Sequence, residues 1–365
     1  MLKQLEVKGS PFDRGVQMGR ALKAGMGRET HGWAKWPADP ATKEKYKALI
    51  PKVSVYLQAQ LPEILEEMQG IAQGASIAFE EAFLLSAGNS LGPAVSSLAC
   101  TSIGFMTSDV GPILGKTDDG GTPPDLDAVI KQRFDNLRAL TIRPDHGYDT
   151  LCVTPLGTIW SECGINAKGL CIGTSSGHPE RTREDGGGIP QHIIPRLVLL
   201  HCADVNEAIE YLKGYDTMGK GINLVLVDEK GNGAAIEAAY TLHGVRRPTN
   251  GVIFATNHYF APEMQVFTAQ TNPEFISSRY FQNSVNRVVN LLGRFGSKEK
   301  GLTFAEMKST LMDHHNPGAI CQHPEDNDAN FLTYYSAILV SKTREMWLNE
   351  GKPCLDRFER YMLAS

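Results

Sequence analysis

Hydrophobic residues recur every three to four positions through most of the first 95 residues, which is the spacing of one buried face of an α-helix. The spacing predicts a helix that begins at Ser10-Pro11 and ends near Gly25, because serine caps a helix and proline fits its first position. Further helices are predicted over about 42–60, from Pro62 to Gly74, and over 79–87. This part of the chain is therefore expected to be nearly all helical.

After Cys100 the hydrophobic runs become short and turn residues separate them, which is typical of strands. Strands are predicted at 101–106, 111–116, 138–143, 149–154, 157–162, 168–174, 222–228, 233–239 and 251–256, and again within 333–349. Helices are predicted at 190–202, from Asp204, at 274–293 and at 303–313. Groups of strands separated by pairs of helices predict an α+β architecture, with helices covering antiparallel sheets.

Composition narrows the class of protein. With 365 residues, of which 42% are hydrophobic and 21% charged, the chain can bury a large core. A net charge of -5 argues against a nucleic-acid surface. No apolar run approaches ~18 residues and the first residues do not read as a signal peptide, so we expect a cytoplasmic protein without a membrane partner. Seven cysteines without a C-x-x-C pair indicate neither a disulfide framework nor a zinc motif, and no cofactor is expected.

The stretch from 96 to 121, S-S-L-A-C-T-S-I-G-F-M-T-S-D-V-G-P-I-L-G-K-T-D-D-G-G, predicts a β-hairpin around a Gly/Asp turn. Cys100 heads the first strand, and Lys116 and Asp119 lie at the far end of the second. In an antiparallel pair the end of one strand lies beside the start of the other. Local structure alone should therefore bring together a thiol, an ammonium and a carboxylate.

A break of the peptide bond between Ala99 and Cys100 would make Cys100 a chain end that could act as a catalytic residue. Cys100 would then carry both a thiol and an α-amine, whose pKa of ~7.7–8.0 lets it take the thiol proton and later protonate a leaving amine. The thiol could also make the break by attacking the carbonyl of Ala99, giving a thioester that water opens. Such a residue would cleave or transfer an acyl group at a linear amide bond of a small molecule.

Other residues would support such a cysteine. Lys116 would lower the thiol pKa if it lies close, and Asp119 could hold the ammonium. Asn257, at the end of the strand 251–256, is the candidate donor to the oxyanion, because its amide carries no charge. The residues expected to line the pocket are Ser175, Ser176 and Tyr259.

Two rival readings use histidines. The segment from Asp313 to Asp328 holds three of them among carboxylates, so metal-dependent hydrolysis through His314, His315 or His323 is one alternative. Its spacing matches no H-E-x-x-H or paired C-x-x-C scheme, so no metal ligand is predicted there. A Cys/His/Asn triad could join Cys100 and Asn257 to His243 or His258, but the C-G-S-C-W surround of papain-like enzymes is absent.

Short motifs along the whole chain resemble those of the penicillin acyltransferase family of self-processing N-terminal nucleophile hydrolases, kin to the bile salt and penicillin V amidases. G-S-P-F-D-R-G-V-Q-M-G at 9–19 and E-E-M-Q-G-I-A-Q-G-A at 66–75 resemble its helical pro-segment. A-C-T-S at 99–102 and G-K-T-D-D at 115–119 resemble its cleavage site and the strand bearing its catalytic aspartate. Later matches are G-I-N-A-K-G-L at 164–170, T-N-H-Y at 256–259 and S-S-R-Y at 277–280.

The resemblance implies an αββα sandwich of two antiparallel sheets, cut autocatalytically from a zymogen into segments 1–99 and 100–365 that stay together as one compact domain. It implies Cys100 as nucleophile, Asp119 as orienting carboxylate, Asn257 as oxyanion donor and Lys116 as the basic residue near them. Assembly into a homo-oligomer is left open.

Two positions depart from the family pattern. Many relatives read I-C-R-H where this chain has I-C-Q-H at 320–323, so an arginine often placed near the nucleophile is absent at Gln322. Thr117 stands where asparagine is frequent. A binding protein that keeps the fold and never matures is therefore an alternative function.

Overall fold

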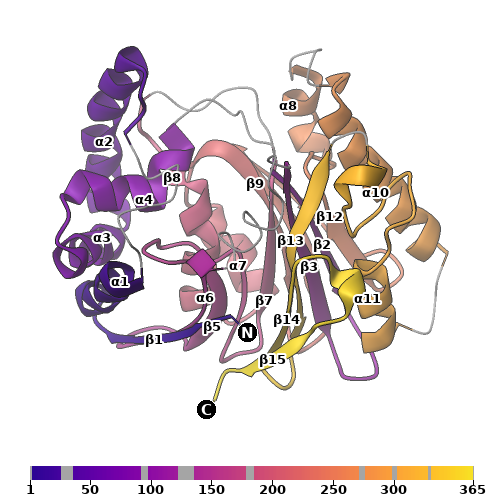
Figure 1. Cartoon of the computed structure of the whole chain (residues 1–365). Coiled ribbons are helices and arrows are strands. Elements are labelled where there is room, and N and C mark those ends of the chain that lie inside the picture. The colour runs from indigo at the N-terminus through magenta and orange to yellow at the C-terminus, as the bar shows by residue number, and fades with distance from the viewer. Residues whose placement is uncertain are drawn as a thin grey trace.

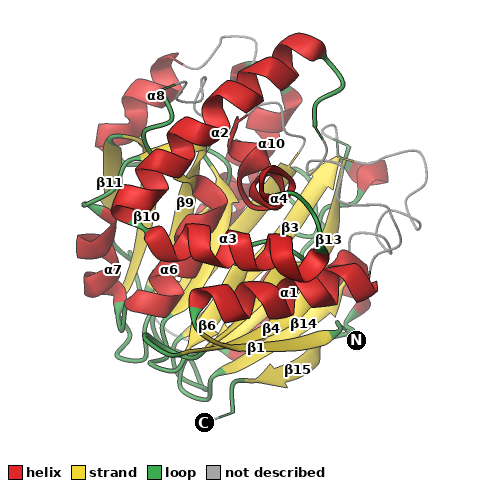
Figure 2. Cartoon of the chain, turned by 90° about the vertical axis from the view of Figure 1, so that its left-hand side faces the viewer, coloured by secondary structure: helices red, strands yellow, loops and turns green. Residues whose placement is uncertain are grey.

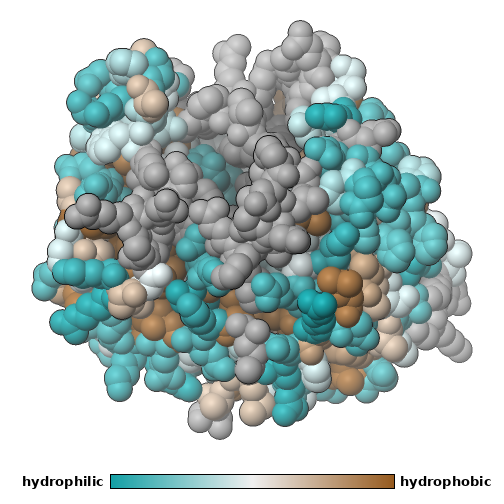
Figure 3. Space-filling model, viewed as in Figure 1, coloured by the Kyte–Doolittle hydropathy of each residue, from teal (hydrophilic) through white to brown (hydrophobic). Residues whose placement is uncertain are grey.

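The computed structural model describes residues 2–25, 36–91, 98–121, 135–177, 185–270, 276–297, 302–327 and 330–364. Two β-sheets pack face to face, and helices cover the outer face of each (Figures 1 and 2). The α+β prediction and the αββα layer order are thus confirmed. In the view of Figure 1, the surface of the helices that flank the sandwich is mostly hydrophilic (Figure 3). Among the described helices, none has the length and apolar character of a membrane span.

The larger sheet has the strand order β1 (Gln4–Gly9), β4 (Leu137–Pro144), β5 (Thr150–Pro155), β6 (Cys163–Asn166), β7 (Cys171–Ser176), β9 (Thr217–Val227), β10 (Gly233–Tyr240) and β11 (Leu242–Arg246), with β8 (Ile189–Pro190) beside β9. Its pairs are antiparallel except β1–β4 and β8–β9. The smaller sheet is antiparallel throughout, in the order β12 (Val252–Ala255), β2 (Leu98–Phe105), β3 (Ile113–Gly121), β13 (Phe331–Val340), β14 (Glu345–Glu350) and β15 (Glu359–Met362).

Each helical layer packs on one sheet. Helices α1 (Pro11–Gly25), α2 (Pro40–Gln60), α3 (Pro62–Ala75), α4 (Phe79–Leu91), α6 (Ile194–His201) and α7 (Val205–Leu212) share a core with the larger sheet. Helices α10 (Arg279–Phe295) and α11 (Phe304–Leu311) pack on the smaller one, and α8 (Gln265–Gln270) precedes them in the chain. A third core fills the space between the sheets.

The predicted helices of the first 95 residues are confirmed in the described part, but the prediction overlooked β1. This short strand pairs with β4, so the helical segment also contributes to the larger sheet. The strand predicted at 157–162 is wrong. There, side chains take the place of a neighbouring strand: Ser86 Oγ accepts from the N–H of Ile159, and Arg196 donates to the carbonyl of Trp160. The structure also adds β11, α8 and β15, which the pattern did not predict.

Helices α1 and α3 cross at backbone contact. A methyl group on Gly70 would lie 2.2 Å from the carbonyl oxygen of Phe12, and one on Gly15 would lie 2.1 Å from that of Glu67. Only glycine permits two helices to approach so closely. Gly15 and Gly19 in the first motif and Gly70 and Gly74 in the second are therefore explained by this packing.

A buried ion-pair network links this helix pair to the rest of the molecule. The carboxylate of Glu67 on α3 lies 3.0 Å from Arg14 on α1 and 3.0 Å from Arg196 on α6. All three residues are at most 4% exposed. Since Arg196 also donates to Ser161 Oγ and Trp160 O, the network joins the segment before Cys100 to the segment after it.

Candidate active site

The hairpin of β2 and β3 is the centre of the site. Its register pairs Cys100 with Asp118 and Ser102 with Lys116. Because side chains alternate along a strand, these four share the face toward the larger sheet, where Lys116 Nζ donates to Thr174 O at 2.8 Å. A thiol, an ammonium and a carboxylate thus share one face of the hairpin, but the carboxylate is Asp118 and not the predicted Asp119.

The thiol of Cys100 lies in a buried and charged surrounding. Its Sγ is 3.7 Å from Asp118 Oδ1. Burial raises the pKa of Cys100 to about 12, although the Lys116 ammonium acts in the opposite direction. Burial alone would lower the pKa of Lys116, but Cys100 and Asp118 raise it above its usual value. The effect expected of Lys116 therefore exists but is smaller than that of burial, and the thiol is protonated at neutral pH.

Asp119 lies on the opposite face of the hairpin. Its carboxylate accepts hydrogen bonds from Thr117 Oγ1 at 3.0 Å and Thr333 Oγ1 at 2.6 Å. Burial raises the pKa of Asp119 to about 7, against the guanidinium of Arg287 and these two hydroxyls. In this structure it is Asp118, rather than the predicted Asp119, that supplies the carboxylate oxygen in contact with the thiol.

Asn257 follows β12 and meets the backbone of Cys100. Its Oδ1 accepts from the Cys100 N–H at 2.8 Å, and its Nδ2 donates to Ser176 O at 3.3 Å. The side chain thus joins the residue predicted as nucleophile to the end of β7. Residues 157 positions apart in sequence are brought together, as the prediction required.

The residues predicted to line the pocket gather beside Asn257. Ser175 Oγ donates to Thr256 O at 2.5 Å, and the Ser176 carbonyl accepts from Asn257. The hydroxyl of Tyr259 is buried and has no hydrogen-bond partner among the described residues. It lies so close to Gly177 that a methyl group there would be 2.1 Å from it.

Arg287 on α10 is a residue of the site that sequence reasoning missed. Its guanidinium is fully buried. One nitrogen donates to the carbonyl of Cys100 at 2.5 Å and to Thr101 Oγ1 at 2.9 Å, and the other donates to Asn257 Oδ1 at 2.9 Å. The only signal in the sequence was its place nine residues after Ser278, which caps the helix of the S-S-R-Y motif.

Comparison with known proteins identifies the family. A model of the acyl-coenzyme A:6-aminopenicillanic acid acyl-transferase family matches residues 108–354, more than half of the chain. The chain belongs to this family. The matched segment includes Lys116, Asp119 and Asn257, and it begins after Cys100.

Solved structures that resemble this acyl-transferase family member do so at low identity. They include penicillin V acylase from Agrobacterium tumefaciens, at 13% identity over 69% of this chain and 83% of that chain, with a TM-score of 0.39. A mutant of conjugated bile acid hydrolase from Clostridium perfringens is 12% identical over 73% of this chain and 97% of that chain, with a TM-score of 0.42. The N-acylethanolamine-hydrolyzing acid amidase ortholog of Caenorhabditis elegans is 14% identical over 73% of this chain and 100% of that chain, with a TM-score of 0.43.

Gln322, at the position where the resemblance led us to expect an arginine, connects to Arg287. Its Oε1 accepts from Asn283 Nδ2 at 3.0 Å, and Asn283 Oδ1 accepts from Arg287 Nε at 3.0 Å. The site therefore contains a buried arginine beside the cysteine, but it comes from α10 and not from position 322, where the resemblance led us to expect it.

The histidines proposed for other chemistry are placed as follows. His258 Nδ1 lies 2.8 Å from Ser284 Oγ, and His243 is on β11. The His315 side chain is 89% exposed and lies 2.8 Å from Asp313. His314 and His323, by contrast, come together with two cysteines.

Proposed function

We propose that this protein is a self-processing cysteine enzyme that cleaves or transfers an acyl group at a linear amide bond through a thioester on Cys100. The observation that carries the proposal is the convergence of three elements on one residue. Asp118 lies at its sulfur, Asn257 at its nitrogen and Arg287 at its carbonyl oxygen. A buried structural cysteine needs no such set of contacts.

Maturation would begin at the thiol of the uncut chain. The thiol gives its proton to Asp118, and the sulfur attacks the carbonyl carbon of Ala99. The bond from that carbon to the nitrogen of Cys100 breaks, and the nitrogen takes up a proton and becomes an amine. Water then attacks the thioester, so that the carbon–sulfur bond breaks, the thiol is restored and Ala99 ends in a carboxylate.

Turnover would use the new amine as the base. With a pKa near 8 in the absence of neighbours, an α-amine can accept the thiol proton at neutral pH, which the buried thiol does not lose by itself. The sulfur attacks the substrate carbonyl, and the departing nitrogen leaves with a proton from the ammonium. Water or a second amine then takes the acyl group and the thiol regains its proton, which makes the reaction hydrolysis or transfer.

The surrounding residues divide the remaining tasks. The Asn257 oxygen holds the nitrogen of Cys100 and one N–H of its Nδ2 donates to Ser176 O, so the second N–H of Nδ2 is the proposed donor to the oxyanion. Lys116 stabilises negative charge on the sulfur, and Asp119 fixes the second strand through two threonines. Ser175, Ser176 and Tyr259 lie near Asn257 and are proposed to contact the substrate.

Mass spectrometry with amino-terminal sequencing tests the proposal. We expect a chain that begins at Cys100 and a second that ends at Ala99, and a single inactive chain for Cys100→Ala. Cys171→Ala, which removes a buried thiol from β7, is the matched control and should mature normally. Wild-type protein that stays intact and fully active would contradict the two-chain mechanism. An intact chain in which a thiol probe labels no active-site residue would instead favour a binding protein.

A further inference from the structure

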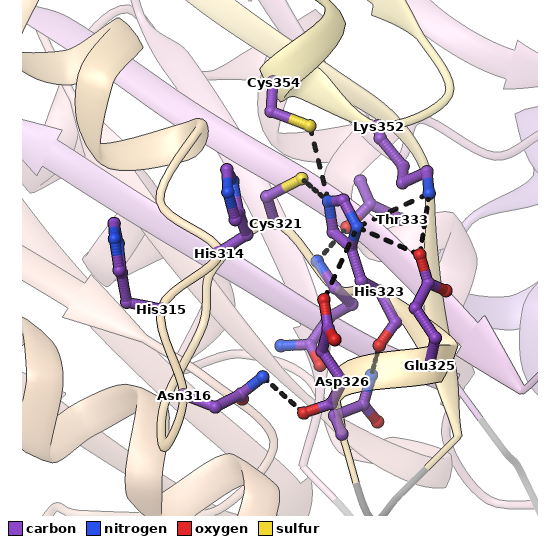
Figure 4. Close-up of polar contacts among 12 residues, drawn as sticks. His314, His315, Asn316, Cys321, His323, Glu325, Asp326, Thr333, Lys352 and Cys354 are labelled. Carbon is purple, nitrogen blue, oxygen red and sulfur yellow. Dashed lines mark hydrogen bonds and ion pairs between the residues drawn. The ribbon is translucent and has the colours of Figure 1, made fainter.

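Potential metal ligands gather outside the proposed active site: His314, His323 and Cys354 form one group, and Cys321 contacts His323. Cys321 and His323 lie in the segment between α11 and β13, and Cys354 lies in the 3-10 turn Pro353–Leu355. One ligand atom each of His314, His323 and Cys354 lies within 4.8 Å of the others. Figure 4 shows both thiols pointing at the same nitrogen of the His323 ring, with His314 beside them and His315 farther out.

The spacing of these atoms suits a single small cation. His323 Nε2 is 3.4 Å from Cys321 Sγ and 3.3 Å from Cys354 Sγ. In tetrahedral zinc, bond lengths of ~2.3 Å to sulfur and ~2.0 Å to nitrogen put neighbouring sulfur and nitrogen ligands about 3.5 Å apart.

Apart from the contacts of His323 with the two thiols, the polar contacts of both imidazoles are made by Nδ1, and Nε2 is the nitrogen that would bind a metal. His323 Nδ1 lies 3.4 Å from the carboxylate of Glu325 and 3.4 Å from the ammonium of Lys352, and this ammonium also lies 3.3 Å from the carboxylate. A carboxylate that accepts from the remote ring nitrogen is the usual support of a metal-bound histidine. His314 Nδ1 lies 3.1 Å from the carbonyl oxygen of Met312, which can only accept. The tautomer that donates from Nδ1 to this carbonyl leaves the lone pair on Nε2 for a metal.

We propose that His314, Cys321, His323 and Cys354 bind one zinc ion. Two thiolates and two imidazoles are the donor set of many structural zinc sites, and the two thiolates neutralise the charge of the ion. Four protein ligands leave no open position for water, so the site is structural and does not hydrolyse substrate. The thiols lose their protons when the ion binds.

The zinc site adjoins the proposed active site through Gln322, which lies between two of its ligands. The backbone N–H of Gln322 donates to Thr333 Oγ1 at 2.8 Å, and Thr333 donates to Asp119. The side chain of Gln322 reaches Arg287 through Asn283. Zinc bound at Cys321 and His323 would therefore fix the segment that supports Asp119 and Arg287.

Elemental analysis of untagged full-length protein tests the site. We expect about one zinc per chain, and visible absorption from thiolate-bound cobalt when Co²⁺ replaces it. Cys354→Ser should weaken Zn²⁺ binding at least ~100-fold, and Glu325→Gln, on an exposed carboxylate, should weaken it about 10- to 100-fold. His315→Ala is the matched control, because this neighbouring histidine lies outside the cluster.

Three results would contradict the zinc site. Zinc binding that is equally strong in Cys354→Ser, or no stoichiometric binding by the wild type, overturns the proposal. Thiol counting that finds Cys321 and Cys354 joined in a disulfide overturns it as well. None of these readouts depends on cleavage before Cys100, so the zinc site and the proposed function stand or fall separately.

Discussion

The guanidinium of Arg287 connects three parts of the site at the scale of a single residue. Its two terminal nitrogens contact the carbonyl of Cys100 and the amide oxygen of Asn257. Charge-assisted hydrogen bonds of this kind are about twice as strong as neutral ones. Because Asn257 Oδ1 accepts from both Arg287 and the N–H of Cys100, the arginine also fixes which way this amide points.

Arg287→Lys should therefore slow the cleavage before Cys100 even though the charge is kept. An ammonium is a point charge and cannot reproduce the planar fork that bridges two acceptors. Displacing a reacting group by about 1 Å can cost on the order of 100-fold in rate, so we expect a loss of that size. The measurement is the rate at which chain 100–365 appears, followed by mass spectrometry.

Arg294→Lys is the control for this prediction. Arg294 lies on the same helix, is partly exposed and pairs with Asp313 away from the hairpin. Its substitution should leave the rate unchanged. Equal rates for Arg287→Lys and the wild type, at equal thermal stability, would remove Arg287 from the site.

At the scale of elements, the sequence predicted the hairpin and missed part of its chemistry. Alternation along β3 places Asp118 and Lys116 on one face and Asp119 on the other. Both the hairpin argument and the family resemblance pointed to Asp119 as the carboxylate next to the thiol, although strand pairing favours its neighbour Asp118. A hairpin is local, so its register could be predicted from the turn between its strands.

Contacts between distant elements could not be predicted in the same way. Arg287 is 187 residues from Cys100, and one more arginine on an amphipathic helix carries no sign that its side chain will be buried. The clustering of Cys321 with Cys354 was hidden for the same reason, since no short metal motif contains both. Strand β1 was overlooked because its six residues gain their partner only from β4.

The close crossing of α1 and α3 predicts that adding a single methyl group at the crossing destabilises the protein. Gly70→Ala should lower the free energy of unfolding by about 1–3 kcal/mol, because the new Cβ would lie 2.2 Å from the carbonyl oxygen of Phe12 and the helices must move apart. Urea denaturation measures the change. Gly293→Ala on α10 is the control: nothing lies within 4 Å of its new methyl group, and a helix gains up to about 1 kcal/mol from such a change.

At the scale of the whole molecule, the segment before the proposed cleavage point is bound to the rest by more than covalent connection. Strand β1 pairs with β4 over six residues. Glu67 on α3 lies between Arg14 of its own segment and Arg196 of the other. A cut between Ala99 and Cys100 would leave these contacts in place, so the two chains should elute together in size-exclusion chromatography.

Glu67→Gln tests how strongly the two segments hold each other. The substitution removes the one carboxylate that faces two buried guanidinium groups, and breaking a buried ion pair in this way typically costs about 3–5 kcal/mol. We expect the urea midpoint to fall by a corresponding amount, and the chains of matured protein to separate at a lower urea concentration than in the wild type. Glu66→Gln changes the neighbouring, exposed carboxylate and should leave both quantities unchanged. A Glu67→Gln protein as stable as that control would mean that the network contributes nothing to the association, and that β1 and the apolar helix faces hold the segments together.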